Sequence, residues 1–163
     1  KGQVSHQMTN TTDIFATLAS VVGYKLGDDV ATDSFDMLPA MLGIQEGTKS
    51  IRPHLLTQSF RGEFQIRQGK WKYLDHRGSG GNNYNRAPLK RYALAETAPR
   101  APGQLFDLEK DPAETTNLYF TEQAKRRELK KLLERLKSSG RSAPRNRIPI
   151  GIENIPRIKK QRK

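Results

Sequence analysis

Two stretches of the chain repeat hydrophobic residues at the spacing of an α-helix. Between Thr11 and Gly23 the apolar positions follow i, i+1, i+4, i+7 and i+8, which is one helical face. They are Ile14, Phe15, Leu18, Val21 and Val22. A second stripe lies within 121–138, where most other positions are Lys, Arg or Glu. It consists of Leu129, Leu132, Leu133 and Leu136, and Gly140 ends the pattern. Both stretches are predicted helices, and a shorter helical turn is predicted at 36–42 before Gly43.

Between the two helices, apolar residues alternate over short runs. The runs at 55–60, 64–68, 71–75 and 104–108 predict strands, and Gln68-Gly69 predicts a tight antiparallel turn. Alternation places Trp71 and Tyr73 on one face and turns Lys70 and Lys72 away. The expected fold class is α+β: a small antiparallel sheet of about four strands, packed against the carboxyl-terminal helix. The first helix has a wide apolar stripe and no strand before it to lie on.

The charge of the chain is concentrated at one end. The net charge is +12 over 163 residues. The segment 124–163 holds 15 Lys and Arg against 3 Asp and Glu, which leaves 14 of the 29 basic and 14 of the 17 acidic residues for 1–123. The segment 140–163 mixes Arg, Pro, Gly and Lys without periodicity, so it is predicted to be disordered and to attract polyanions nonspecifically.

Several candidate sites lack the spacing that their chemistry requires. The GSGG run at 78–81 has no following lysine and hydroxyl of a phosphate loop. His6, His54 and His76 lie too far apart for a zinc pattern, and Ser59 has no base at a readable spacing. The aspartates at 28, 29, 33 and 36 lack the glycine and glutamate of a calcium loop. The sequence contains no cysteine, and no apolar run reaches the roughly 18 residues of a membrane span, so no membrane partner is expected.

Four stretches, in order, resemble the carboxyl-terminal region of formylglycine-dependent sulfatases, the arylsulfatase-like group. The first is VSHQMTNTTDIFATLASVVG, with Asp13, Ile14, Thr17 and Gly23 at the family's helix positions. The second is DSFDMLPAMLG, the third is FQIRQGKWKYL followed by GSGG, and the fourth is QLFDLEKDPAETTNLY. Together they cover about 4–119.

The resemblance implies a division of the chain. Residues 1–50 would be the end of a catalytic α/β domain with its connecting loops, and 51–139 the carboxyl-terminal subdomain, before the basic tail 140–163. The Thr11–Gly23 helix would then belong to the large domain. Away from that domain, Ile14, Phe15 and Leu18 are expected to be exposed. The chain begins with Lys, which fits a mature or truncated product.

The resemblance also implies a reaction, the hydrolysis of sulfate esters of aryl or carbohydrate substrates. The family uses a formylglycine made from Cys or Ser and a calcium ion. Its nucleophile motif is C/S-x-P-S-R, and the stretch from Ser142 to Asn146 departs from it. No family catalytic or metal residue carries over, so the chain alone is expected to be inactive. Export or a periplasmic location follows only by family analogy.

Substrate selection is the role that the resemblance carries over to this chain. The family segment H-H-S-x-x-G aligns with Thr57, Gln58, Ser59 and Gly62, so both histidines are replaced. Gln58, Ser59 and Arg61 are the predicted contacts at the rim of the substrate site. The alternative hypothesis is a basic nucleic-acid-binding module that uses the hairpin around Trp71 and the tail.

Overall fold

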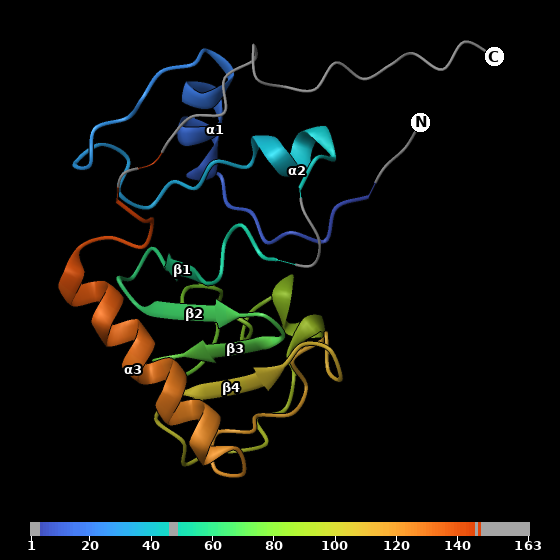
Figure 1. The fold of residues 1–163 in the computed structure, drawn as a ribbon. Helices are drawn as coiled ribbons and strands as arrows, with labels where there is room; N and C mark the ends of the chain where they lie inside the picture. Colours follow the sequence, from blue (N-terminus) through green and yellow to red (C-terminus); the bar gives the residue numbers. More distant parts are fainter. Residues whose placement is uncertain (1–3, 46–48, 146, 148–163) are drawn as a thin grey trace. The chain divides into compact units, whose positions relative to one another are not determined.

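The computed structural model describes residues 4–45, 49–145 and 147 (Figure 1). The chain divides into two compact units. We call Pro53–Gly140 the sheet unit, and Lys1–Arg52 with Arg141–Lys163 the helical unit. The division joins the segment after the carboxyl-terminal helix to the amino-terminal part of the chain.

The sheet unit contains one four-stranded antiparallel sheet in the order β1-β2-β3-β4. Its strands are β1 (Leu55–Gln58), β2 (Phe64–Gln68), β3 (Trp71–Leu74) and β4 (Gln104–Asp107). Each predicted run therefore forms a strand, and neighbours in the chain are neighbours in the sheet. The long excursion between β3 and β4 contains the 3-10 helix η1 (Leu89–Tyr92).

The β2–β3 turn lies one residue later than predicted. Gln68 pairs with Trp71 across the strands, so the two loop residues are Gly69 and Lys70. Gly69 has φ +56, which a glycine adopts without steric cost at the first loop position. The predicted Gln68-Gly69 turn was thus correct in its glycine and wrong in its register.

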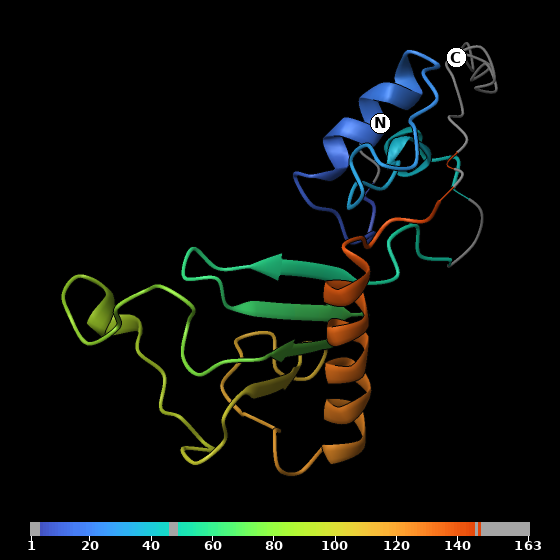
Figure 2. The ribbon, with the colours of Figure 1, turned by 90° about the vertical axis from the view of Figure 1, so that its left-hand side faces the viewer.

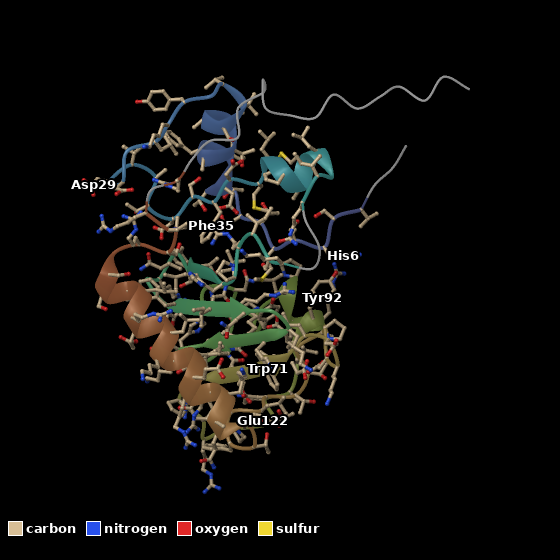
Figure 3. All side chains as sticks on the ribbon, in the orientation of Figure 1. His6, Asp29, Phe35, Trp71, Tyr92 and Glu122 are labelled. Carbon is tan, nitrogen blue, oxygen red and sulfur yellow. The ribbon has the colours of Figure 1, made fainter. Side chains whose placement is uncertain are left out.

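Helix α3 (Gln123–Ser139) covers one face of the sheet (Figures 1 and 2). Leu129 and Leu133 are fully buried, in one cluster with Ile66 and Tyr73. Trp71, labelled in Figure 3, is half-buried and packs against this cluster. The predicted α+β class and the inward orientation of Trp71 and Tyr73 are confirmed.

The two lysines beside Trp71 form ion pairs. The Lys72 ammonium lies 2.7 Å from a Glu114 carboxylate oxygen, and the Lys70 ammonium lies 2.8 Å from Glu109 and 3.3 Å from Asp107. These contacts raise the pKa of Lys70, chiefly through the hydrogen bond to Glu109. The lysines therefore hold acidic side chains at the end of β4 and in the loop after it.

Two aspartates in and after β4 are held in their charged form. Burial alone would raise the pKa of Asp107, but hydrogen bonds from Lys70 and the Glu109 backbone leave it lowered. Asp111 accepts hydrogen bonds from the Thr115 hydroxyl and the Thr116 backbone, at 2.9 and 2.8 Å, and backbone donors lower its pKa. In its ionised form, each carboxylate therefore stabilises the folded state relative to the unfolded state.

We expect the sheet unit to lose stability in acid through these two groups. A carboxyl group whose folded pKa is lowered stabilises the fold above its unfolded pKa, about 3.9, and loses this contribution as the pH falls through the folded pKa. The urea midpoint, followed by Trp71 fluorescence, should fall as the pH drops below about 4. Asp111→Asn should flatten this fall, and Asp29→Asn, outside the sheet unit, should not. An equally steep fall in Asp111→Asn would contradict the assignment.

The helical unit is built on α1 (Asp13–Val21) and α2 (Leu38–Leu42). On α1 the apolar stripe faces outward: Ile14, Phe15 and Leu18 are 53%, 55% and 58% exposed. Their predicted exposure is confirmed. The buried face of α1 consists of the small or polar residues Asp13, Ala16, Thr17, Ala19 and Ser20.

Polar side chains on that buried face fix the segment before α2. The Asp13 carboxylate accepts a hydrogen bond from the Phe35 backbone N–H at 2.9 Å. The Thr17 hydroxyl accepts one from the Met37 N–H at 3.0 Å. In return, the Ala16 N–H donates to the Ser34 hydroxyl at 2.8 Å. The aspartate and threonine of the first motif thus have a structural role, because they satisfy buried backbone donors.

The first residues after α3 pack on the helical unit. The Arg141 guanidinium donates to the Asp28 carbonyl at 2.9 Å, and the Ser142 hydroxyl donates to the Asp33 carboxylate at 2.7 Å. Ala143 is buried in a small cluster with Phe35. The disorder predicted for 140–163 therefore does not hold at 141–145. Residues 146 and 148–163 lie outside the described residues.

Candidate functional site

The three predicted rim residues lie at the β1–β2 connection. Gln58 ends β1, and residues 59–63 form the turn into β2. The Ser59 backbone N–H donates to the Glu63 carbonyl at 2.8 Å. The Ser59 hydroxyl accepts from the backbone N–H groups of Arg61 and Glu63 at 3.2 and 3.3 Å, and donates to the Glu63 carboxylate at 3.3 Å. Ser59 therefore shapes the turn rather than offering a free hydroxyl.

The tip of this turn is open to solvent. Gln58 and Arg61 are exposed, and Phe60 is 87% exposed. The Arg61 guanidinium carbon lies 5.9 Å from the centre of the Phe60 ring. An exposed guanidinium beside an exposed aromatic ring offers a charged and an apolar contact at one place.

The glycine loop at 78–81, which follows β3 in the chain, packs against this turn. A β-carbon on Gly80 would lie 2.9 Å from the Ser59 β-carbon and 3.2 Å from His76 Cε1. Gly80 also has φ +73, so a side chain there would be strained as well as obstructed. The His76 Nδ1 atom lies 3.9 Å from the Glu63 carboxylate and 3.1 Å from the Arg77 carbonyl. We call residues 58–63, His76 and 78–81 the rim cluster.

The structure thus unites motifs that the sequence leaves separate. The GSGG run, considered above as a phosphate loop, is a close packing partner of Ser59. Glu63 and His76 were not predicted as members of the site. One feature of the sequence could have indicated them: Glu63 directly precedes β2, and His76 follows β3 by two residues. In an antiparallel pair, the start of one strand lies beside the end of the next, so residues at these positions lie close together.

Comparisons with known proteins place the chain in a family. The chain matches no protein-family profile. It is 34% identical over 121 residues to arylsulfatase A of Homo sapiens, covering 71% of this chain and 23% of the relative. It is 31% identical over 126 residues to N-acetylgalactosamine-6-O-sulfatase of Bacteroides thetaiotaomicron, covering 77% of this chain and 23% of the relative.

A solved structure supports the same relationship. That structure was solved in work on the metabolism of multiple glycosaminoglycans by Bacteroides thetaiotaomicron. It matches this chain with a TM-score of 0.58 at 30% sequence identity. The match covers 77% of this chain and 24% of that structure's chain. The chain belongs to the sulfatase family. It spans about a quarter of the length of the relatives that it matches.

The described part of this sulfatase segment contains neither a cysteine nor a cluster of metal-ligating side chains. The sequence contains no cysteine from which a formylglycine could form. The Ser142 hydroxyl donates a hydrogen bond to the Asp33 carboxylate, and the next residue, Ala143, is buried. The stretch from Ser142 to Asn146 departs from the family's nucleophile motif. Among the described residues, no group of three or more His, Asp or Glu could hold a metal ion, and this includes the aspartates of 28–36.

Within the described residues, the rim cluster does not form an activated nucleophile. Ser59 makes no hydrogen bond to His76, although both lie beside Gly80. A serine nucleophile requires a base within hydrogen-bonding reach. Among the described residues, Ser59 therefore lacks the base that would activate it.

The nucleic-acid hypothesis for the hairpin is not supported. Trp71 packs against the core cluster, and the lysines on either side of it are engaged with Glu109 and Glu114. Base stacking requires an accessible aromatic face beside free cations. Across 4–45, 49–145 and 147, no helix is long and apolar enough to cross a membrane.

Proposed function

We propose that this chain is the carboxyl-terminal portion of a sulfatase that hydrolyses aryl or carbohydrate sulfate esters. The observation that carries the proposal is the 30–34% identity to sulfatases across most of the chain. One relative is named for a sulfate on N-acetylgalactosamine, which favours a carbohydrate sulfate. By family analogy, the whole protein would be exported.

The role we assign to this portion is to form the rim of the substrate site. Arg61 is exposed at the tip of the turn, and a guanidinium pairs well with the oxygens of an anionic group. Gln58 is exposed beside it, and its side chain donates to the Gly62 carbonyl at 3.2 Å. Ser59 holds the turn in this conformation. Basic residues after 140 would add a nonspecific attraction for sulfated glycans.

The reacting groups in this proposal lie outside the chain. Formylglycine and calcium would be supplied by a catalytic domain encoded upstream, since the described residues do not fit either group. The purified 163-residue chain should therefore not turn over p-nitrophenyl sulfate, whereas the full gene product should. Turnover by the purified chain would show that it carries its own catalytic groups.

In the full gene product, we expect Arg61→Ala to weaken substrate binding. Loss of one charge-assisted contact should raise KM by about tenfold and leave kcat within about twofold. Arg127→Ala, an exposed arginine on α3, is the matched control and should leave KM unchanged. Equal effects of the two variants on KM would mean that Arg61 acts only through overall charge.

A further inference from the structure

A cleft of about 570 Å³ lies on the face of the sheet that α3 does not cover. Its floor is formed by side chains from β2, β3 and β4, among them Gln65, Leu74 and Gln104. Its walls come from the excursion after β3 and from the loop after β4. Figures 1 and 2 show α3 and this excursion on opposite sides of the sheet. The volume is within the range of small-molecule sites, roughly 300–1,000 Å³.

The strand pattern explains why polar side chains lie on the floor beside the apolar Leu74 and Phe106. On β2, Phe64 and Ile66 pack toward the α3 side, so Gln65 between them faces the cleft. A glutamine amide in such a place presents both a donor and an acceptor. The Gln65 side chain makes no hydrogen bond to any residue within the described ranges. It is therefore available to a ligand.

The charged groups in the cleft already have partners within the protein. The Lys72 ammonium lies 2.7 and 2.9 Å from the two carboxylate oxygens of Glu114. Glu96 accepts hydrogen bonds from the Ala98 backbone at 2.7 Å and the Asn117 amide at 3.1 Å. An ionic ligand would have to displace these partners, whereas an uncharged polar ligand would not.

Aromatic side chains line the wall beside these amides. Tyr92, labelled in Figure 3, lies on η1 and is 58% exposed. The Arg91 guanidinium carbon lies 4.8 Å from the centre of its ring, a contact that holds the ring in place. Tyr84 also lines the cleft, and its hydroxyl accepts a hydrogen bond from Asn82 at 3.4 Å.

We propose that this cleft binds a neutral sugar unit of a glycan. Sugar hydroxyls donate and accept hydrogen bonds, as do the amides and hydroxyls of the lining. The apolar face of a pyranose ring matches an exposed tyrosine ring, which is apolar at its body and polar at its tip. Lys72 is the one Lys or Arg among the described lining residues and is paired with Glu114, which disfavours a sulfate or another anion in the cleft. The inference goes beyond the proposed function, because it needs neither a sulfate nor a catalytic domain.

The cleft and the rim cluster share the glycine loop. Gly78 and Ser79 line the cleft, while Gly80 packs on Ser59 of the turn. A glycan seated in the cleft would therefore extend toward the rim turn within the same unit.

The test uses the 163-residue chain and two uncharged probes, chitotriose and cellotriose, in an NMR titration of backbone amides. We expect at least one probe to shift the amides of Gln65, Tyr92 and Gln104, with a dissociation constant on the order of millimolar. The constant should be unchanged between low and high salt, because the ligand carries no charge to be screened. No shift with either probe at about 20 mM, well above that range, would overturn the proposal.

Matched variants separate the cleft from the rest of the surface. Gln65→Ala and Tyr92→Ala should each weaken binding by about tenfold or more. Gln68→Ala, on the same strand outside the cleft, and Tyr24→Ala, an exposed tyrosine of the helical unit, should not. Unchanged Trp71 fluorescence would show that the variants fold. If cleft and control variants weaken binding alike, or not at all, the cleft is not the sugar site. Since hydrolysis is not measured, failure here leaves the proposed sulfatase function standing.

Discussion

Replacing Arg52 with alanine is expected to lower the stability of the helical unit by about 3–5 kcal/mol. Arg52 and Asp13 are 2% and 1% exposed, and they form a buried ion pair. The Arg52 guanidinium also donates to the Asp33 carbonyl at 2.7 Å and lies 4.4 Å from the centre of the Phe35 ring. Its removal leaves the Asp13 carboxylate buried without its counter-charge, which costs far more than the loss of an exposed pair.

Amide hydrogen exchange at Phe35 and Met37 reports this loss locally. Both N–H groups donate to side chains of α1, so their exchange should accelerate in Arg52→Ala. Arg127→Ala, an exposed arginine of the sheet unit, serves as the control and should leave both rates unchanged.

A double variant distinguishes the ion pair from simple packing. Asp13→Leu with Arg52→Met removes both charges and keeps most of the buried volume, so it should destabilise less than the sum of the two single variants. Additive losses, or a loss below about 1 kcal/mol in Arg52→Ala, would contradict a buried pair of this kind.

The sequence could predict α1 but not the partners that hold it. Periodicity located the helix, and the lack of a preceding strand indicated that Ile14, Phe15 and Leu18 would be exposed. The buried face is instead held by hydrogen bonds that the Asp13 carboxylate accepts from residues 22 and 39 positions away. Such contacts leave no local pattern, because their spacing in the chain follows no helical or strand period.

The rim turn shows the same division between local and non-local information. Alternation placed Ser59 within a predicted strand at 55–60, whereas β1 ends at Gln58 and Ser59 lies in the turn into β2. Its contacts with the 78–81 loop depend on how the excursion after β3 returns to the sheet, which local spacing does not encode. The disorder predicted from the composition of 140–163 fails at 141–145 for a similar reason, because the contacts there are with distant parts of the chain. The carbonyl groups that accept from Arg141 and Arg147 lie more than 100 residues earlier.

Leu133→Ala is expected to lower the stability of the sheet unit by about 2–5 kcal/mol. Leu133 is fully buried between α3 and the sheet, in one cluster with Ile66 and Tyr73. Alanine would leave a cavity at this contact, and a core of this size has few other apolar residues to fill it. The urea midpoint followed by Trp71 fluorescence measures the loss, because Trp71 packs against the same cluster.

Leu132→Ala is the matched comparison, because it makes the same substitution at the neighbouring position of the same helix. The cost in helix propensity cancels between the two variants, so their difference reports burial alone. Leu132 is only half-buried at the edge of the cluster, and its replacement should cost about 1 kcal/mol or less. Equal losses would mean that α3 does not present the Leu133 face to the sheet. A larger loss of unfolding free energy in Leu133→Ala than in Leu132→Ala, with an unchanged denaturant slope, would show that the packing of α3 on Ile66 and Tyr73 stabilises the sheet unit.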